Sequence, residues 1–122
     1  MEVRLGFEEG EKMKVKMELD LEVQMGVGSP NGTGCQGYMP EGTTYDDLVE
    51  VFDEPQITSS LDGKIQAEWF GRINGLQFTI YDYKSRVTPE RNTDWHIGGK
   101  KKFVAPLIDM YFKNFLDQRI RA

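Results

Sequence analysis

The clearest pattern in the chain is a strict alternation of apolar and polar side chains between Met13 and Met25. Apolar residues occupy every odd position of this stretch, and charged or amide residues occupy every even one. A period of two places successive side chains on opposite faces of a β-strand, so a strand with one apolar face is predicted. These thirteen residues exceed the roughly 5–6 of an ordinary strand. We therefore expect this strand to bend, to extend beyond the domain or to pair with another subunit.

Residues 26–42 contain six glycines and two prolines and predict a long Gly-rich loop. Loops of this length in a compact domain are usually functional or mobile. Thr44 follows as a helix N-cap, and apolar residues continue at helical spacing as far as Phe52. Pro55 cannot continue a helix, so a short helix is predicted between these two residues.

Asn74-Gly75 predicts the turn of a β-hairpin whose strands cover residues 64–72 and 77–84. A type I′ turn places Trp69 opposite Ile80 on the core face. The other face then carries more aromatic side chains than a solvated surface needs. Its residues are Gln66, Glu68, Phe70 and Arg72 on one strand and Gln77, Thr79, Tyr81 and Tyr83 on the other.

The last third of the chain predicts a short strand and a C-terminal helix. Trp95-His96-Ile97 has the composition of a strand, and Pro106 suits the first turn of a helix with an apolar stripe through Phe115. The order of elements favours a single α+β domain over residues 1–122. We expect an antiparallel β-sheet with a long N-terminal strand, one short helix and one C-terminal helix.

Composition narrows the classes of protein. No run reaches the ~18 apolar residues that cross a bilayer, and the first residues lack the layout of a signal peptide. The single cysteine suits a reducing compartment, so we expect a cytoplasmic protein without membrane contact. A net charge of −5 argues against binding to duplex nucleic acid and leaves room for a small anionic ligand.

Candidate catalytic and metal-binding residues are sparse. Cys35 and His96 are the only residues of their types and would have to meet in space to form a nucleophile and base. Cys35 has no basic neighbour in the sequence, which favours an ordinary thiol and a structural or ligand-contacting imidazole. A zinc site needs more ligands than these two. We therefore predict no catalytic residues, no metal and no cofactor.

Two segments have the chemistry of a nucleotide site. Gly98-Gly99-Lys100 provides either backbone N–H groups and an ammonium for a phosphate, or a tight turn beside a solvated lysine run. Residues 91–96 (Arg-Asn-Thr-Asp-Trp-His) combine a ring for stacking, groups for ribose hydroxyls and a base for phosphate. Trp95 fits the core equally well.

Four motifs resemble a family of small phage and prophage proteins. They are Phe-x-Glu-Pro from Phe52, Asp-Gly-Lys-x-x-x-Glu-Trp from Asp62, Thr-Ile-Tyr-Asp-Tyr-Lys from Thr79, and Trp-His-Ile-Gly-Gly from Trp95. The resemblance covers about residues 43–115. Asp53 stands where the family usually has glycine, which leaves the end of the first helix open.

The resemblance points to the Thoeris anti-defence sponges, which bind a cyclic ADP-ribose-type immune signal without cleaving it and assemble as homo-oligomers. It implies a phage-encoded nucleotide-binding protein of the host cytoplasm, a dimer or larger. The alternatives are a phage inhibitor that binds a host or defence protein directly, and a virion protein. The predicted ligand-binding residues are Phe70, Arg72, Tyr83, Arg91, Asn92, Asp94, His96 and Lys100.

Overall fold

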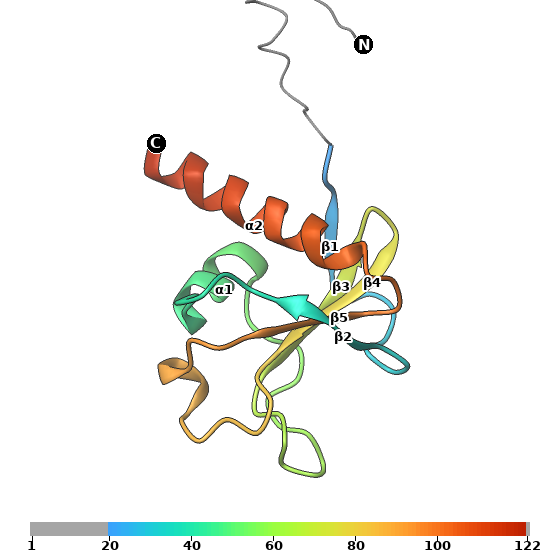
Figure 1. The fold of residues 1–122 in the computed structure, drawn as a ribbon, viewed down its shortest axis with the longest axis vertical. Helices are drawn as coiled ribbons and strands as arrows, with labels where there is room; N and C mark the ends of the chain where they lie inside the picture. Colours follow the sequence, from blue (N-terminus) through green and yellow to red (C-terminus); the bar gives the residue numbers. More distant parts are fainter. Residues whose placement is uncertain (1–19, 122) are drawn as a thin grey trace, which may run out of the picture.

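A computed structural model of the chain describes residues 20–121. They form a five-stranded antiparallel sheet in the order β1-β3-β4-β5-β2, with two helices packed on it (Figure 1). The predicted α+β class, with one short and one C-terminal helix, is confirmed. The elements are β1 (Val23–Met25), β2 (Gly34–Tyr38), α1 (Tyr45–Phe52), β3 (Glu68–Ile73), β4 (Leu76–Tyr81), the 3₁₀ turn η2 (Pro89–Arg91), β5 (His96–Gly99) and α2 (Val104–Arg121).

The predicted long N-terminal strand is not confirmed. Only β1 is a strand in the described part of that stretch, and residues 13–19 lie outside the described chain. β1 begins only at Val23, because the partner of Val23 in the sheet, Ile73, is the last residue of β3. One residue earlier, Glu22 forms two hydrogen bonds with Asn74 of the hairpin turn. The Glu22 N–H donates to the Asn74 Oδ1, and the Glu22 carbonyl accepts from the Asn74 N–H.

The β3–β4 hairpin has the predicted register. Trp69 pairs with Ile80 and Gly71 with Phe78. Asn74 and Gly75 both adopt positive φ angles, 49° and 81°, as a type I′ turn requires. The strands are shorter than predicted at the end away from the turn. β3 begins at Glu68 and β4 ends at Tyr81, so residues 64–67 and 82–84 lie outside them.

The predicted 26–42 loop is wrong in part, because β2 lies within it and pairs with β5. Gly37 of β2, and Gly99 of its partner strand β5, leave room for α2 on the sheet. A Cβ on Gly37 would lie 2.9 Å from the Ala105 Cβ of α2, and one on Gly99 of β5 would lie 2.6 Å from a Val104 methyl. Glycine therefore lets both strands lie close under the start of α2.

The core lies between the helices and one face of the sheet. Trp69 and Trp95 meet edge to face there, with ring centroids 5.5 Å apart. Trp95 is thus a core residue, the second of its two predicted roles. Leu48 and Phe52 of α1 and Ile108 of α2 are fully or almost fully buried in the same cluster. Both helices therefore cover a single face, and within residues 20–121 the opposite face carries no helix (Figure 1).

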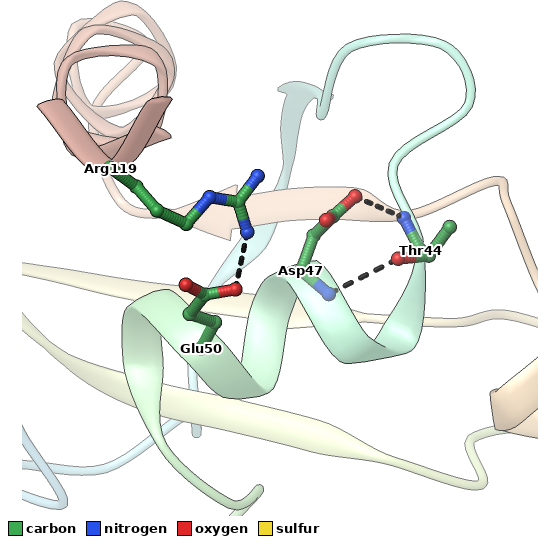
Figure 2. Close-up of polar contacts among 4 residues, drawn as sticks. All are labelled: Thr44, Asp47, Glu50 and Arg119. Atoms are coloured by element: carbon green, nitrogen blue, oxygen red, sulfur yellow. Dashed lines mark hydrogen bonds and ion pairs between the residues drawn. The ribbon is translucent and has the colours of Figure 1, made fainter. Parts of the chain in front are cut away.

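Helix α1 begins and ends with specific backbone contacts. The Thr44 hydroxyl accepts a hydrogen bond from the Asp47 N–H, and the Asp47 carboxylate accepts one from the Thr44 N–H (Figure 2). This capping box satisfies two N–H groups that a helix start leaves free. Figure 2 also shows Arg119 of α2 in an ion pair with Glu50, which links the two helices on the exposed side.

Asp53 ends α1 with φ 67° and ψ −167°, a conformation that favours glycine. Helix α1 therefore ends at Phe52, with Asp53 as its C-cap. The Asp53 carbonyl accepts a 2.6 Å hydrogen bond from the Trp69 indole, which helps hold this backbone in position.

Helix α2 starts two residues before Pro106, which lies within its first turn as predicted. In residues 20–121, no helix combines the length and hydropathy that a membrane span requires.

Candidate functional site

The face of the sheet opposite the helices, here called the open face, carries two cross-strand rows of side chains. Directly paired residues of antiparallel strands point to the same face. The first row runs Tyr38, His96, Tyr81 and Glu68 across β2, β5, β4 and β3. The second runs Cys35, Gly98, Thr79 and Phe70 across the same strands. The sheet register thus gathers residues from four separate strands.

The three rings of the first row, here called the aromatic row, stand close together. The His96 ring centroid lies 4.9 Å from that of Tyr38 and 5.2 Å from that of Tyr81, and the Tyr81 pair is stacked at 29°. Tyr83, just beyond the end of β4, lies 6.0 Å from His96. Aromatic groups at this spacing offer flat apolar surface with hydroxyl and imidazole groups at its edge.

A groove of about 870 Å³ lies over the aromatic row. This volume is within the range of small-molecule sites, about 300–1,000 Å³. Two loops complete its walls, residues 30–33 on one side and residues 57–65 on the other. The lining residues are Pro30, Asn31, Gly32, Thr33, Cys35, Tyr38, Ile57, Ser59, Ser60, Leu61, Ile65, Glu68, Tyr81, Tyr83 and His96.

A second hollow, of about 810 Å³, lies between Asp20–Glu22, Asn74 and the Tyr111 side of α2. Among the described residues, its lining includes two acids, Asp20 and Glu22, but neither a stacked ring pair nor a thiol beside an imidazole. The groove on the open face, which has both, is therefore the candidate site.

The loop wall is fixed by Asp82, which is fully buried just after β4. Its carboxylate accepts hydrogen bonds from the Gln66 N–H at 2.8 Å, the Ala67 N–H at 3.1 Å and the Gln66 side-chain amide at 3.3 Å. The same amide also donates to the Val87 carbonyl at 2.9 Å. Asp82 thus holds the end of the 57–65 loop against the sheet and serves the shape of the groove.

Glu68 is the only carboxylate that lines the groove in the described chain. Its burial, and after that the nearby charge of Asp82, raise its pKa, while the adjacent Thr79 hydroxyl acts more weakly in the opposite direction. No described residue donates a hydrogen bond of normal geometry to its carboxylate or forms an ion pair with it. Apart from this contact with Thr79, Glu68 therefore presents its acceptor atoms to the groove.

Thr79, in the second row, is fully buried, and its hydroxyl has no hydrogen-bond partner within the described residues. It lies over Gly98, where a Cβ would approach the hydroxyl oxygen to 2.7 Å and a Tyr81 ring carbon to 3.2 Å. The missing side chain at Gly98 therefore leaves room for Thr79 and for the edge of the Tyr81 ring.

The groove also contains the thiol and the imidazole. The Cys35 Sγ lies 3.8 Å from the His96 Nδ1, so the structure brings together the two residues considered as a nucleophile and base. Cys35 raises the pKa of Tyr38, with a smaller effect from burial. Burial first, and then Cys35, raise the pKa of Tyr81 to about 12. Both phenols therefore stay protonated and available as hydrogen-bond donors at neutral pH.

Four predicted ligand-binding residues lie in the groove or at its edge. His96 and Tyr83 line it. Asp94 is exposed and close enough to Tyr38 to contribute, after Cys35, to the rise in the pKa of that phenol. Lys100 is exposed beside the 30–33 loop, where its Cε lies 3.7 Å from the position of a Cβ on Gly32.

The other four do not line the groove. Asn92 is buried, and its side chain bonds to the Asp94 backbone, which fixes the turn before β5. Arg91 is exposed in η2, the turn that packs against α1. Phe70 and Arg72 are on the open face. Phe70 belongs to the second row, and Arg72 lies two residues farther along β3.

The Gly98-Gly99-Lys100 segment is not a phosphate-binding turn, because both glycines are inside β5, between β4 and β2. The strand residues of the groove that were missing from the predicted site are Cys35, Tyr38, Glu68 and Tyr81. The hairpin register contains the signal for Glu68 and Tyr81, which it pairs on the open face. No sequence signal marks Cys35 and Tyr38, because β2 is hidden in the Gly-rich segment.

Within residues 20–121, no group of three or more His, Cys, Asp or Glu side chains is arranged to hold a metal ion. The site is thus a groove with an aromatic floor, one carboxylate, a thiol–imidazole pair and a lysine beyond one wall. No protein-family model, curated protein or solved structure matches this chain.

Proposed function

We propose that this protein binds a nucleotide-type small molecule in the groove and holds it without chemical change. The observation that carries the proposal is the aromatic row, whose three rings lie open to a groove of ligand size. A planar base gains about 1–3 kcal/mol by stacking on such a ring. Tyrosine hydroxyls at the edge of the row supply donors for the sugar.

The position of Lys100 fits the phosphate end of the same ligand. It follows β5, four positions after His96, so the two residues are roughly 13 Å apart along the chain direction at ~3.3 Å per residue. A base stacked on the aromatic row then directs its phosphates toward an ammonium group beside the 30–33 loop. This arrangement tolerates the net charge of −5, because one local cation suffices.

The resemblance of the sequence supports a more specific role. We propose that the ligand is a cyclic ADP-ribose-type immune signal and that the protein is a phage anti-defence sponge of the host cytoplasm, acting as a homo-oligomer. Sequestration requires tight binding and slow release, and it needs no catalytic group. The two loop walls provide contacts that a shallow sheet surface lacks.

Calorimetric titration with cyclic ADP-ribose and with ADP-ribose tests binding. The Lys100→Ala variant is expected to lose about 1.5–3 kcal/mol of affinity, since a charge-assisted contact is removed. Lys113→Ala is the matched control, because Lys113 is exposed on α2 and pairs only with Asp109 in the described chain. Equal losses in both variants would contradict the proposed phosphate position.

Heat denaturation of the loaded protein, followed by mass spectrometry of the released ligand, tests retention without cleavage. Recovery of intact ligand supports a sponge. Native mass spectrometry of the same sample reports the assembly state.

Thiol chemistry is the second candidate function, because the Cys35 Sγ lies 3.8 Å from the His96 Nδ1. In that case His96 accepts the thiol proton, and the Cys35 thiolate bonds to the anomeric carbon of a ligand ribose as the bond from that carbon to its leaving group breaks. His96 returns the proton to the leaving group, and water then displaces the thiol and completes a hydrolysis. Released product in place of intact ligand, lost in Cys35→Ser, would replace the sponge proposal with this one.

A further inference from the structure

The groove contains an unbalanced set of hydrogen-bonding groups at the Glu68 end. Three tyrosine hydroxyls and two serines can donate as well as accept, but the Glu68 carboxylate can only accept when it is ionised. Among the described residues that line the groove, none is a lysine or arginine. A ligand that covers Glu68 must therefore bring its own donor, or the carboxylate loses water without compensation.

Glu68 also has a defined place relative to the aromatic row. It pairs directly with Tyr81 in the sheet, and Ile57 pairs with it from the other side. Neighbouring strands are about 4.8 Å apart. A ring stacked on Tyr81 thus lies about one strand spacing from Glu68.

The carboxylates of Glu68 and Asp82 disfavour a negatively charged or carbonyl group of a ligand next to Glu68. Asp82 is buried, and its charge helps to raise the pKa of Glu68, while no lysine or arginine is among the described residues that line the groove. A carbonyl oxygen of a ligand at the same place would meet the carboxylate oxygens directly. An amino group would supply an N–H donor to the carboxylate.

We propose that Glu68 determines the base specificity of the groove, by accepting a hydrogen bond from an exocyclic amino group of a base stacked on the aromatic row. This inference rests on the proposed function, since it requires a nucleotide in the groove. It assigns the ligand class: a base with an amino group at that edge is bound, and its counterpart with a carbonyl group is rejected. Sites built to bond one partner discriminate strongly against an analogue that leaves the buried group unpaired.

ADP and IDP test the proposal, because ADP has an amino group beside an unprotonated N1 on the base, where IDP has a carbonyl group beside an N1–H. Calorimetric titration of the full chain is expected to show at least about tenfold tighter binding of ADP, the effect of one hydrogen bond to a charged group. Glu68→Gln is expected to bind both with similar affinity, since an amide can rotate to donate to a carbonyl or to accept from an amine.

Glu50→Gln is the matched control. It makes the same chemical change on α1, on the helix-covered side of the sheet, where Glu50 pairs with Arg119. This variant is expected to keep the full preference for ADP. A melting curve of each variant verifies that the domain is folded.

The outcomes separate the two proposals. Similar affinities for ADP and IDP in the wild-type protein, or a preference that survives in Glu68→Gln, overturn the role of Glu68 and leave nucleotide binding intact. Absence of binding by ADP, IDP and cyclic ADP-ribose overturns the proposed function, and this inference with it.

Discussion

The Cys35 thiol and the His96 imidazole lie 3.8 Å apart on neighbouring strands, although 61 positions separate the two residues in the sequence. Both side chains line the groove, and Cys35 is exposed. The contact follows from the pairing of β2 with β5 and from the irregular register between Cys35 and Gly37. The Cys35 thiol is therefore a position within the proposed ligand site that a thiol reagent can modify.

Alkylation of Cys35 is therefore expected to block nucleotide binding, because the added group occupies the groove beside His96. Cys35 is the only cysteine of the chain, so a thiol reagent modifies one position. The measurement is calorimetric titration before and after treatment with iodoacetamide. Cys35→Ala, treated in the same way, is expected to bind unchanged by the reagent. Full binding by the alkylated wild-type protein would place the ligand elsewhere.

The glycines at one β2–β5 pair are expected to respond very differently to alanine. Gly99 and Gly34 are register partners. A Cβ on Gly99 would lie 2.6 Å from a Val104 methyl and 3.1 Å from the Gln77 carbonyl, while one on Gly34 would meet nothing within 4 Å. Gly99→Ala should cost about 1–3 kcal/mol in the free energy of unfolding through overpacking. Gly34→Ala should stay within about 0.5 kcal/mol of the wild type. Urea denaturation measures both, and equal losses would argue against the close packing under α2.

Asp53→Gly is expected to stabilise the domain. The wild-type residue adopts φ 67° and ψ −167°, which glycine adopts without a steric penalty. Relief of this strain contributes about 1–3 kcal/mol, less the greater freedom of glycine in the unfolded chain. Asp53→Ala removes the same carboxylate but keeps the Cβ, so it should not show the gain. A lower melting temperature for the glycine variant than for the alanine variant would contradict this interpretation.

Ionisation of the Tyr81 phenol is expected to lower the free energy of unfolding at alkaline pH. Its pKa is raised to about 12 from an ordinary value of 10.0, chiefly by burial. The folded state therefore keeps a proton that the unfolded state loses, and the free energy of unfolding falls as pH rises from about 10 to about 12. Tyr81→Phe should lack this contribution, so the stability difference between the two proteins should be constant below that window and shrink within it. Denaturant titrations at a series of pH values measure the difference.

Local signals in the sequence predicted most of the fold. The Asn74-Gly75 turn fixed the hairpin register, and Thr44 with Asp47 marked the start of α1, because these features depend on residues only a few positions apart. β2 was missed because glycine normally indicates a loop, whereas Gly37 is required here by its contact with Ala105 of α2. That contact joins segments far apart in the chain, and no local pattern encodes it.

The candidate site was harder to predict than the fold. His96 and Tyr83 were found because they belong to segments rich in ring and polar groups, and both line the groove. Asn92 has the right chemistry for a ligand, yet its amide is bonded to the Asp94 backbone. Whether a polar side chain faces a ligand or the chain itself depends on the local backbone conformation, which composition does not determine.

The order of the strands has a consequence for how the domain assembles. β1 and β2 are consecutive in the sequence, yet they occupy opposite edges of the sheet. During synthesis, β2 has no partner until β5 has left the ribosome, whereas the β3–β4 hairpin can form as soon as it emerges. We expect the hairpin to nucleate folding and the β2–β5 edge to close last, because long-range strand pairing is slow. Nascent chains that end before His96 would then be folded in part and unable to capture any ligand.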